Sequence, residues 1–172
     1  GEATRVAEAD ATTWVRLVGG GVRGWGKGGA GRLGSGNRDN RGDGAVDPLS
    51  GTDDASTVPL GGPAIAISAG GEFTCALLSA GTVRCWGDGR FGVLGSRGTD
   101  ARLDGLAGGP TDDASTVPLA GAAVAISAGP QHACALLAGG AVSCWGNGAD
   151  GRLGTGAVDD RLVAVDQRPC EV

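Results

Sequence analysis

Residues Thr74–Gly87 read TCALLSAGTVRCWG, a β-hairpin pattern that recurs along the chain. Residues Thr13–Gly26, TWVRLVGGGVRGWG, match this stretch at an offset of 61 residues. An offset of 59 maps its Cys-Ala-Leu-Leu and Cys-Trp-Gly segments onto Cys134–Leu137 and Cys144–Gly146. The chain therefore contains three units of about sixty residues, of which the first is the most diverged.

The periodicity inside a unit is that of strands. Alternate residues along Cys75–Ser79 face opposite sides, as in a strand. Gly81 is available for the left-handed position of a three-residue hairpin loop. With that loop, Cys75 falls directly opposite Cys85.

Two further segments complete a unit of four short antiparallel strands. Ala64–Ser68 is an apolar strand before the hairpin, and Ser56–Leu60 is an edge strand that tolerates proline. Such units, recurring at this period, predict an all-β fold of about three β-propeller blades. We expect one propeller domain with a degenerate first blade at 1–60, a second blade at 61–119 and a third blade with a C-terminal tail at 120–172.

These units resemble a bacterial version of the regulator of chromosome condensation repeat. The resemblance rests on Gly70…Thr74-Cys-Ala-Leu, Gly81-Thr-Val…Cys85-Trp-Gly and Gly92-Val-Leu-Gly95, with the third-unit matches Gly129…His132-Ala-Cys-Ala-Leu, Gly140-Ala-Val…Cys144-Trp-Gly and Gly151-Arg-Leu-Gly154. Where the family often has Asn, this chain has Gly28, Gly89 and Gly148. Where the family often has Gln, it has Arg32, Val93 and Arg152. The family's propeller generally has seven blades, so the resemblance implies an incomplete propeller that further blades or a second copy would close.

Composition narrows the classes of function. The chain has 172 residues, 36 of them glycine, and a formal net charge of −5. This acidic balance, without a Lys/Arg cluster, disfavours nucleic-acid binding. No run of eighteen apolar residues is present, so we expect no membrane insertion, and no basic leader stands at the start.

Glycine-rich motifs recur directly after the hairpin in every unit. Each has the form G-x-G-x-x-G, at Gly26/Gly28/Gly31, Gly87/Gly89/Gly92 and Gly146/Gly148/Gly151. A dinucleotide site would need a helix next, and no helical periodicity follows. The stretch Gly21–Gly28 lacks the Ser or Thr of a phosphate-binding loop. We interpret these motifs as loops and expect no cofactor.

The single histidine, His132, lies on the strand face of Cys134 and invites a Cys–His nucleophile or a zinc site. No base-orienting partner or further metal ligand stands out. The second unit has Phe73 at the histidine position, and the resemblance implies a structural histidine that links strand to loop. We therefore expect neither catalytic residues nor a metal site.

The cysteines indicate disulfides. Cys75 opposes Cys85 and Cys134 opposes Cys144, while the first unit replaces both members together, with Trp14 and Gly24. A ring lying over a glycine would fill the space of the lost pair. Joint loss favours disulfide bonding over two buried thiols, and hence an oxidising compartment. Cys170 is left over.

Trp25, Trp86 and Trp145 recur at one position per unit, which favours packing between blades over a ligand-stacking site. The first two units also carry long insertions, Ser35–Gly51 and Ser96–Pro110, that the third lacks. Loops of this length in compact domains are usually functional or disordered. The candidate partner-binding side chains are Arg38, Arg41, Arg97, Arg102 and Asp104. The tripeptide Arg41-Gly42-Asp43 is interpreted as a solvated turn.

These observations predict a non-catalytic protein-interaction module, extracellular or in the cell envelope, that binds an unidentified protein through its loops. Secreted members of the resembling family include an inhibitor of β-lactamases, so enzyme inhibition is one form of this function. The alternative is guanine-nucleotide exchange on a small GTPase, which would place the protein in the cytoplasm. A Cys134/His132 hydrolase comes last.

Overall fold

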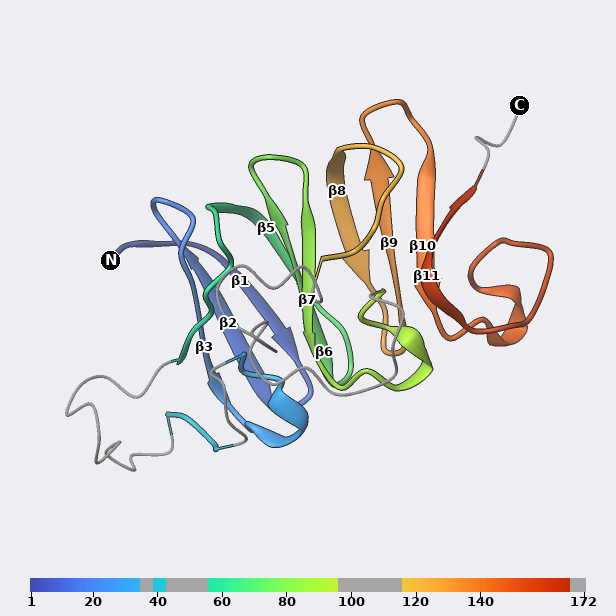
Figure 1. Cartoon of the computed structure of the whole chain (residues 1–172). Helices are drawn as coiled ribbons and strands as arrows, with labels where there is room; N and C mark the ends of the chain where they lie inside the picture. The colour runs from blue at the N-terminus through green and yellow to red at the C-terminus, as the bar shows by residue number, and fades with distance from the viewer. Residues whose placement is uncertain (35–38, 43–55, 96–115, 168–172) are drawn as a thin grey trace.

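The computed structural model describes residues 1–34, 39–42, 56–95 and 116–167, which form three antiparallel sheets (Figure 1). The first sheet has the order β1 (Ala3–Ala9), β2 (Thr12–Leu17), β3 (Val22–Gly26), β4 (Ser56–Thr57). The second contains β5 (Ala64–Ala69), β6 (Phe73–Leu78) and β7 (Val83–Gly87). The third contains β8 (Ala123–Ala128), β9 (His132–Leu137), β10 (Val142–Gly146) and β11 (Arg161–Gln167).

The hairpin register predicted from the sequence is confirmed. Cys75 pairs with Cys85 across β6 and β7. The backbone N–H of Leu78 donates to the carbonyl oxygen of Thr82 at 2.8 Å, which closes the turn. Gly81 has φ of 79°, the left-handed conformation that glycine adopts without steric cost.

The proline-containing edge strand is shorter than predicted. Only Ser56–Thr57 of the expected Ser56–Leu60 forms a strand, and Thr57 pairs with Arg23 of β3. Val58 makes one more backbone bond, to the carbonyl oxygen of Val22 at 3.2 Å. Pro59 follows and has no N–H to donate, so the ladder ends there. In the second sheet the edge position holds a single bridge, from Thr116 to Arg84.

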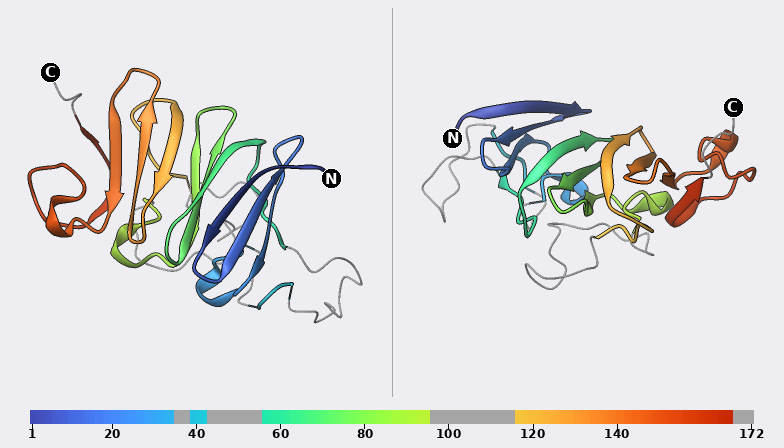
Figure 2. Two further views of the ribbon diagram at one scale, coloured as in Figure 1. Left: turned by 180° about the vertical axis from the view of Figure 1, so that it is seen from behind. Right: turned by 90° about the horizontal axis from the view of Figure 1, so that it is seen from above.

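The three sheets stand side by side in a row (Figure 1). Strands β1, β5 and β8 lie along one side of this row when it is seen from above (Figure 2, right). Each sheet thus has the orientation of a propeller blade whose first strand is innermost. The arrangement is an incomplete β-propeller, because among the described residues the first and last sheets each have one neighbouring sheet.

The hydrophobic core lies between the sheets, in two layers. Between the first and second sheets, Trp14 meets Trp86 edge to face, with ring centroids 5.3 Å apart. Between the second and third, Leu77 and the Cys75–Cys85 pair are buried in one cluster with Trp145. Because every buried face needs a facing sheet, the row is held together by these side-chain layers.

The glycine-rich motifs form loops, as predicted, and each loop contains one short 3-10 turn. These turns are η1 (Gly29–Gly31), η2 (Arg90–Gly92) and η4 (Ala149–Gly151). Among the residues that the structure describes, no helix has the length and apolar character needed to cross a membrane.

Candidate functional site

One end of the three sheets carries most of the irregular backbone, and we call it the loop end (Figure 1, bottom). The antiparallel register produces it, because β6 begins where β7 ends, with Phe73 opposite Gly87. The turn before β6 and the loop after β7 therefore lie together, and the same holds in the other sheets. The loop end comprises Asp10–Ala11, 27–34, 70–72, 88–95, 129–131 and 147–154.

A pocket of about 330 Å³ opens at the loop end, and all three units contribute to it. Its polar wall contains Asp10, Glu72, Asp88, Arg90 and Gln131. Its apolar wall contains Phe73, Phe91, Val93 and Pro130. Binding sites usually combine apolar surface with a few convergent charged groups, as this pocket does.

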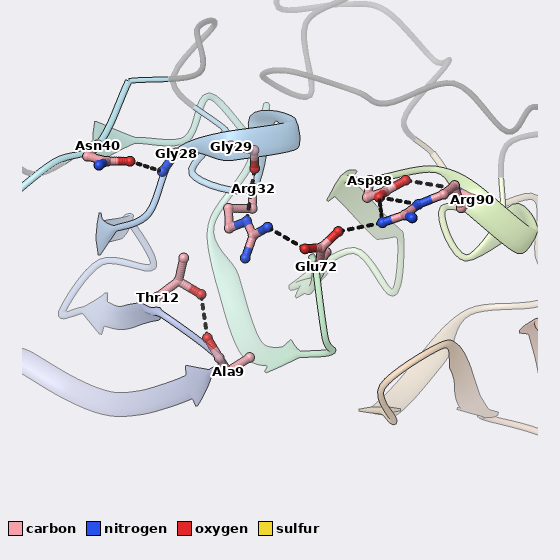
Figure 3. A network of polar contacts seen from close by, with 9 residues as sticks. All are labelled: Ala9, Thr12, Gly28, Gly29, Arg32, Asn40, Glu72, Asp88 and Arg90. Carbon is pink, nitrogen blue, oxygen red and sulfur yellow. Dashed lines mark hydrogen bonds and ion pairs between the residues drawn. The ribbon is translucent and has the colours of Figure 1, made fainter.

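A chain of ion pairs joins two units beside this pocket (Figure 3). Glu72 accepts a hydrogen bond from Arg32 Nη2 on Oε1 at 2.7 Å and one from Arg90 Nη2 on Oε2 at 2.6 Å. Arg90 Nε in turn donates to Asp88 Oδ2 at 2.6 Å. Arg32 is only 4% exposed, whereas Arg90 is 67% exposed. The network thus begins at the buried guanidinium of Arg32 and ends at the exposed guanidinium of Arg90.

The same network sets the charge of Asp88. Partial burial raises the pKa of this carboxyl, but hydrogen bonds from the side chain and backbone of Arg90 outweigh burial and hold it below its usual value. The side-chain hydrogen bond to Asp88 likewise raises the pKa of Arg90. Asp88 and Arg90 therefore remain a charged pair at neutral pH.

Phe91 stands beside Arg90 in an unusual backbone conformation. Its φ is 60° and its ψ 10°, the left-handed region that side chains other than glycine rarely adopt. Ala30 and Asp150 have φ of 58° at the equivalent positions, so three different side chains project from the same turn. The backbone conformation therefore belongs to the repeat, and the units differ in the side chain that they present there. Phe91 is 38% exposed.

Of the predicted partner-binding side chains, the structure places one. The backbone of Arg41 exchanges two hydrogen bonds with Gly26, at 2.7 and 2.9 Å. Asn40 accepts a hydrogen bond from the Gly28 N–H at 3.0 Å (Figure 3), which also fastens this segment to the loop end. Arg41 is half-buried and is not part of the pocket wall. The other four candidates, Arg38, Arg97, Arg102 and Asp104, lie outside the described residues.

The predicted cysteine pairs lie at disulfide distance. Sγ atoms are 2.07 Å apart in Cys75–Cys85 and 2.11 Å apart in Cys134–Cys144. A Cys134 that is bonded to Cys144 would have no free thiol to act as the nucleophile of a hydrolase. Cys170 lies outside the described residues.

The first unit fills the cysteine position as the sequence predicted. Trp14 pairs with Gly24, and a Cβ placed on Gly24 would lie 2.4 Å from a carbon of the indole ring. The ring therefore lies directly over the glycine and occupies the space that the disulfides fill in the other units.

The recurring tryptophans differ in their surroundings. Trp86 and Trp145 are fully buried between sheets, where each donates its indole N–H to the loop of the preceding unit. Trp25 is half-buried on the outer side of the first sheet.

The ring of His132 lies over Gly129, as the ring of Phe73 lies over Gly70. Its Nδ1 is buried and has no hydrogen-bond partner among the described residues. Burial lowers the pKa of His132, and the positive charge of Arg152 lowers it further. Across the described ranges, no group of three or more His, Cys, Asp or Glu side chains is placed to hold a metal ion.

The sequence interpretation missed the pocket residues, although a signal for them exists. Glu72 aligns with Gln131 and Asp88 with Asn147, and in the third unit these two amides bond to each other at 2.8 Å. The same two positions thus hold two carboxylates that Arg90 bridges in one unit and two amides that bond to each other in another. Variation at fixed positions of a repeat is typical of a binding surface.

Comparison with known proteins identifies the repeats. Residues 64–93 and 123–152 match the family described as "Regulator of chromosome condensation (RCC1) repeat". The chain is 34% identical over 141 residues to the human E3 ubiquitin-protein ligase HERC2. The matched region covers 78% of this chain and 2% of HERC2. The mouse HERC2 matches to the same extent.

Solved structures of the same fold include Prp20p of Saccharomyces cerevisiae, described with its binding properties to Gsp1p and histones. It superposes with a TM-score of 0.72 at 20% identity, over 98% of this chain and 39% of that chain. A complex of Kap60 with yeast RCC1 (Prp20) gives 0.71 at 18% identity, over 98% and 37%. Human WBSCR16 gives 0.51 at 18% identity, over 99% and 54%. The chain therefore spans well under two thirds of the length of these proteins.

Proposed function

Because this chain belongs to the RCC1-like β-propeller family, we propose that it is a non-catalytic protein-interaction module that binds its partner through the loop end. The observation that carries the proposal is the pocket of about 330 Å³ to which all three units contribute. Solved relatives of this fold bind proteins, namely Gsp1p, histones and Kap60. A protein partner suits a scaffold whose framework is fixed and whose loop positions vary.

The exposed residues of the loop end suit a protein interface with an aromatic anchor and a polar rim. Phe91 offers an exposed aromatic side chain, and Arg90 offers an exposed guanidinium held in place by two carboxylates. Aromatic residues and arginine dominate the binding energy of protein interfaces. Asp88 and Glu72 hold the Arg90 guanidinium before binding, which lowers the entropy cost of association. We therefore assign Arg90 and Phe91 as the principal contacts.

We further propose that the protein works in an oxidising compartment, outside the cell or in its envelope, and that inhibition of an enzyme is one form its binding takes. The two cysteine pairs at disulfide distance support the compartment, because such bonds persist where thiols are not kept reduced. Nucleotide exchange on a small GTPase stays an alternative. The similarity to the yeast structures, at 18–20% sequence identity, supports a common fold and does not favour exchange over other kinds of protein binding.

A site-specific photo-crosslinker tests the proposal in the protein's own cells. The crosslinking amino acid replaces Phe91 at the loop end or, as a control, Val18, which is 64% exposed in the hairpin at the opposite end. We expect a defined crosslinked protein from position 91 and none from position 18. Equal crosslinking from both positions, or none from position 91, would contradict the proposal.

A further inference from the structure

Two arginines of the first sheet lie directly opposite each other. Arg5 of β1 pairs with Arg16 of β2 in the antiparallel register, immediately after a bulge in β1. Side chains at opposed positions extend from the same face of a sheet, with Cβ atoms about 5 Å apart, and like charges placed in this way destabilise the sheet. Two positive charges therefore stand at adjacent positions in a chain whose formal net charge is −5.

The equivalent pair is apolar in the other two sheets. After the corresponding bulge, Ala66 pairs with Leu77 in the second sheet and Ala125 pairs with Leu136 in the third. Both members of the pair thus differ together in the first unit, as both members of the cysteine pair do. An alanine–leucine pair forms the same ladder in two units, so the sheet itself does not require the two arginines.

Arg16 lies on the side of the first sheet that faces the second sheet, not on the outer side of the row. Trp14, two positions earlier on the same face of β2, packs against Trp86 of the second sheet. Arg16 Nη1 donates to the carbonyl oxygen of Ala64, at the start of β5, at 3.5 Å. The arginine pair is close to the hairpin turn at 18–21, at the opposite end of the sheets from the pocket.

The two positive charges are not compensated. Among the residues that the structure describes, no carboxylate lies within ion-pair distance of Arg5 or Arg16. The strands of the facing sheet, β5, β6 and β7, contain no Asp or Glu. Arg16 Nε is buried and has no hydrogen-bond partner in the described part of the chain. The Arg16 guanidinium thus keeps unused hydrogen-bond donors beside a second positive charge.

We propose that Arg5 and Arg16 form a binding site for a doubly charged tetrahedral oxyanion, such as phosphate or sulfate. A phosphate group carries a charge of about −1.5 to −2 at neutral pH, which matches two guanidiniums, whereas a carboxylate carries one charge and would neutralise half of the pair. Several oxygens on one anion accept hydrogen bonds from both guanidiniums at once. Arg5 is exposed and Arg16 is half-buried, so a dissolved anion can reach the pair.

Calorimetric titration of the whole chain with inorganic phosphate, at constant ionic strength, tests this site. We expect saturable one-to-one binding of phosphate and of sulfate. Acetate, which carries one charge, should bind about tenfold more weakly or less. O-phosphoserine distinguishes a phosphate ester from the free ion: binding of both phosphate compounds supports recognition of the ester, and binding of inorganic phosphate alone supports recognition of the free ion.

The variants take their residues from the second unit. Arg5→Ala and Arg16→Leu introduce the residues of the Ala66–Leu77 pair, so each variant should fold and show wild-type thermal unfolding in phosphate-free buffer. Each should weaken phosphate binding about tenfold or more. The matched control is Lys27→Ala, which removes an exposed positive charge from the loop end. This control should bind phosphate like the wild type.

Three results would overturn the proposal. The first is a wild-type chain that binds neither phosphate nor sulfate. The second is phosphate binding that survives in the double variant Arg5→Ala/Arg16→Leu, because the anion site would then lie elsewhere. The third is binding of acetate as tight as that of phosphate, because the pair would then not select a doubly charged anion.

Discussion

Arg32 Nη2 lies 2.7 Å from Glu72 Oε1, and this ion pair ties a loop of the first unit to a turn of the second. The two residues are forty positions apart in the sequence. Arg32 is 4% exposed and Glu72 36% exposed, so the cation depends on this carboxylate for its charge partner. The ion pair therefore both joins two sheets and fixes one wall of the pocket.

Replacing Glu72 with glutamine, the residue that the third unit has at this position, should lower the free energy of unfolding by about 1–3 kcal/mol. The loss arises because the substitution leaves the buried guanidinium of Arg32 without its carboxylate partner. Urea denaturation followed by tryptophan fluorescence measures it. Arg90→Ala is the control, and its effect should be smaller because water already solvates that side chain. Equal losses would show that burial of Arg32 is not the cause.

His132→Phe should flatten the pH dependence of stability on the acid side. Burial first, and then the charge of Arg152, lowers the pKa of His132 below 6.5 in the folded chain. The unfolded chain therefore binds the proton more readily, and folding free energy is lost as pH falls from 6.5 through the lowered pKa. The variant places in the third unit the residue that the second unit uses, Phe73. Thermal melts from pH 7.5 to 5 check it, and parallel curves for both proteins would contradict the assignment.

Gly24→Ala should destabilise the first sheet by about 1–3 kcal/mol, because the added methyl group would overpack against Trp14. The nearest ring carbon would lie 2.4 Å from the new Cβ. Gly139→Ala is the matched control, since no atom lies within 4 Å of its Cβ position. Its effect should stay within about 0.5 kcal/mol. Chemical denaturation of the two variants side by side measures the difference.

Removing the cystine of the second sheet, with Cys75→Ala and Cys85→Ala together, should cost about 2–3 kcal/mol of unfolding free energy. The two cysteines are ten positions apart in the sequence, so the bond closes a short loop in the unfolded chain. A reductant should lower the stability of the wild type and affect the double variant less. Thiol counting by mass spectrometry on protein from its own cells tests the compartment. Four reactive thiols at these positions would contradict an oxidising location.

The sequence predicted the hairpin, its register and the interior of each sheet, because those features depend on neighbours within about a dozen residues. The Cys75–Cys85 register follows from the turn at Gly81. The placement of Trp14 over Gly24 follows from comparing one unit with another. Because the units repeat, an inference drawn from one unit could be checked against the equivalent residues of the others.

The pocket could not be predicted in the same way. The ion pairs beside it join Arg32 to Glu72 and Glu72 to Arg90, which are 40 and 18 positions apart in the sequence. No motif marks such pairs, because sheet packing brings them together. Loop length directed attention to the insertions instead, where Arg41 is placed outside the pocket wall and the other candidates lie beyond the described residues. Their role in partner binding stays a prediction.

Hydrogen–deuterium exchange of the chain, with and without the protein captured by the crosslinker at position 91, tests the central claim most directly. Binding through the loop end predicts slower exchange at 70–72, 88–95 and 129–131, with no change in the hairpin turns at 18–21, 79–82 and 138–141. Protection confined to those hairpin turns, at the opposite end of the sheets, would show that the partner binds there and would contradict the account.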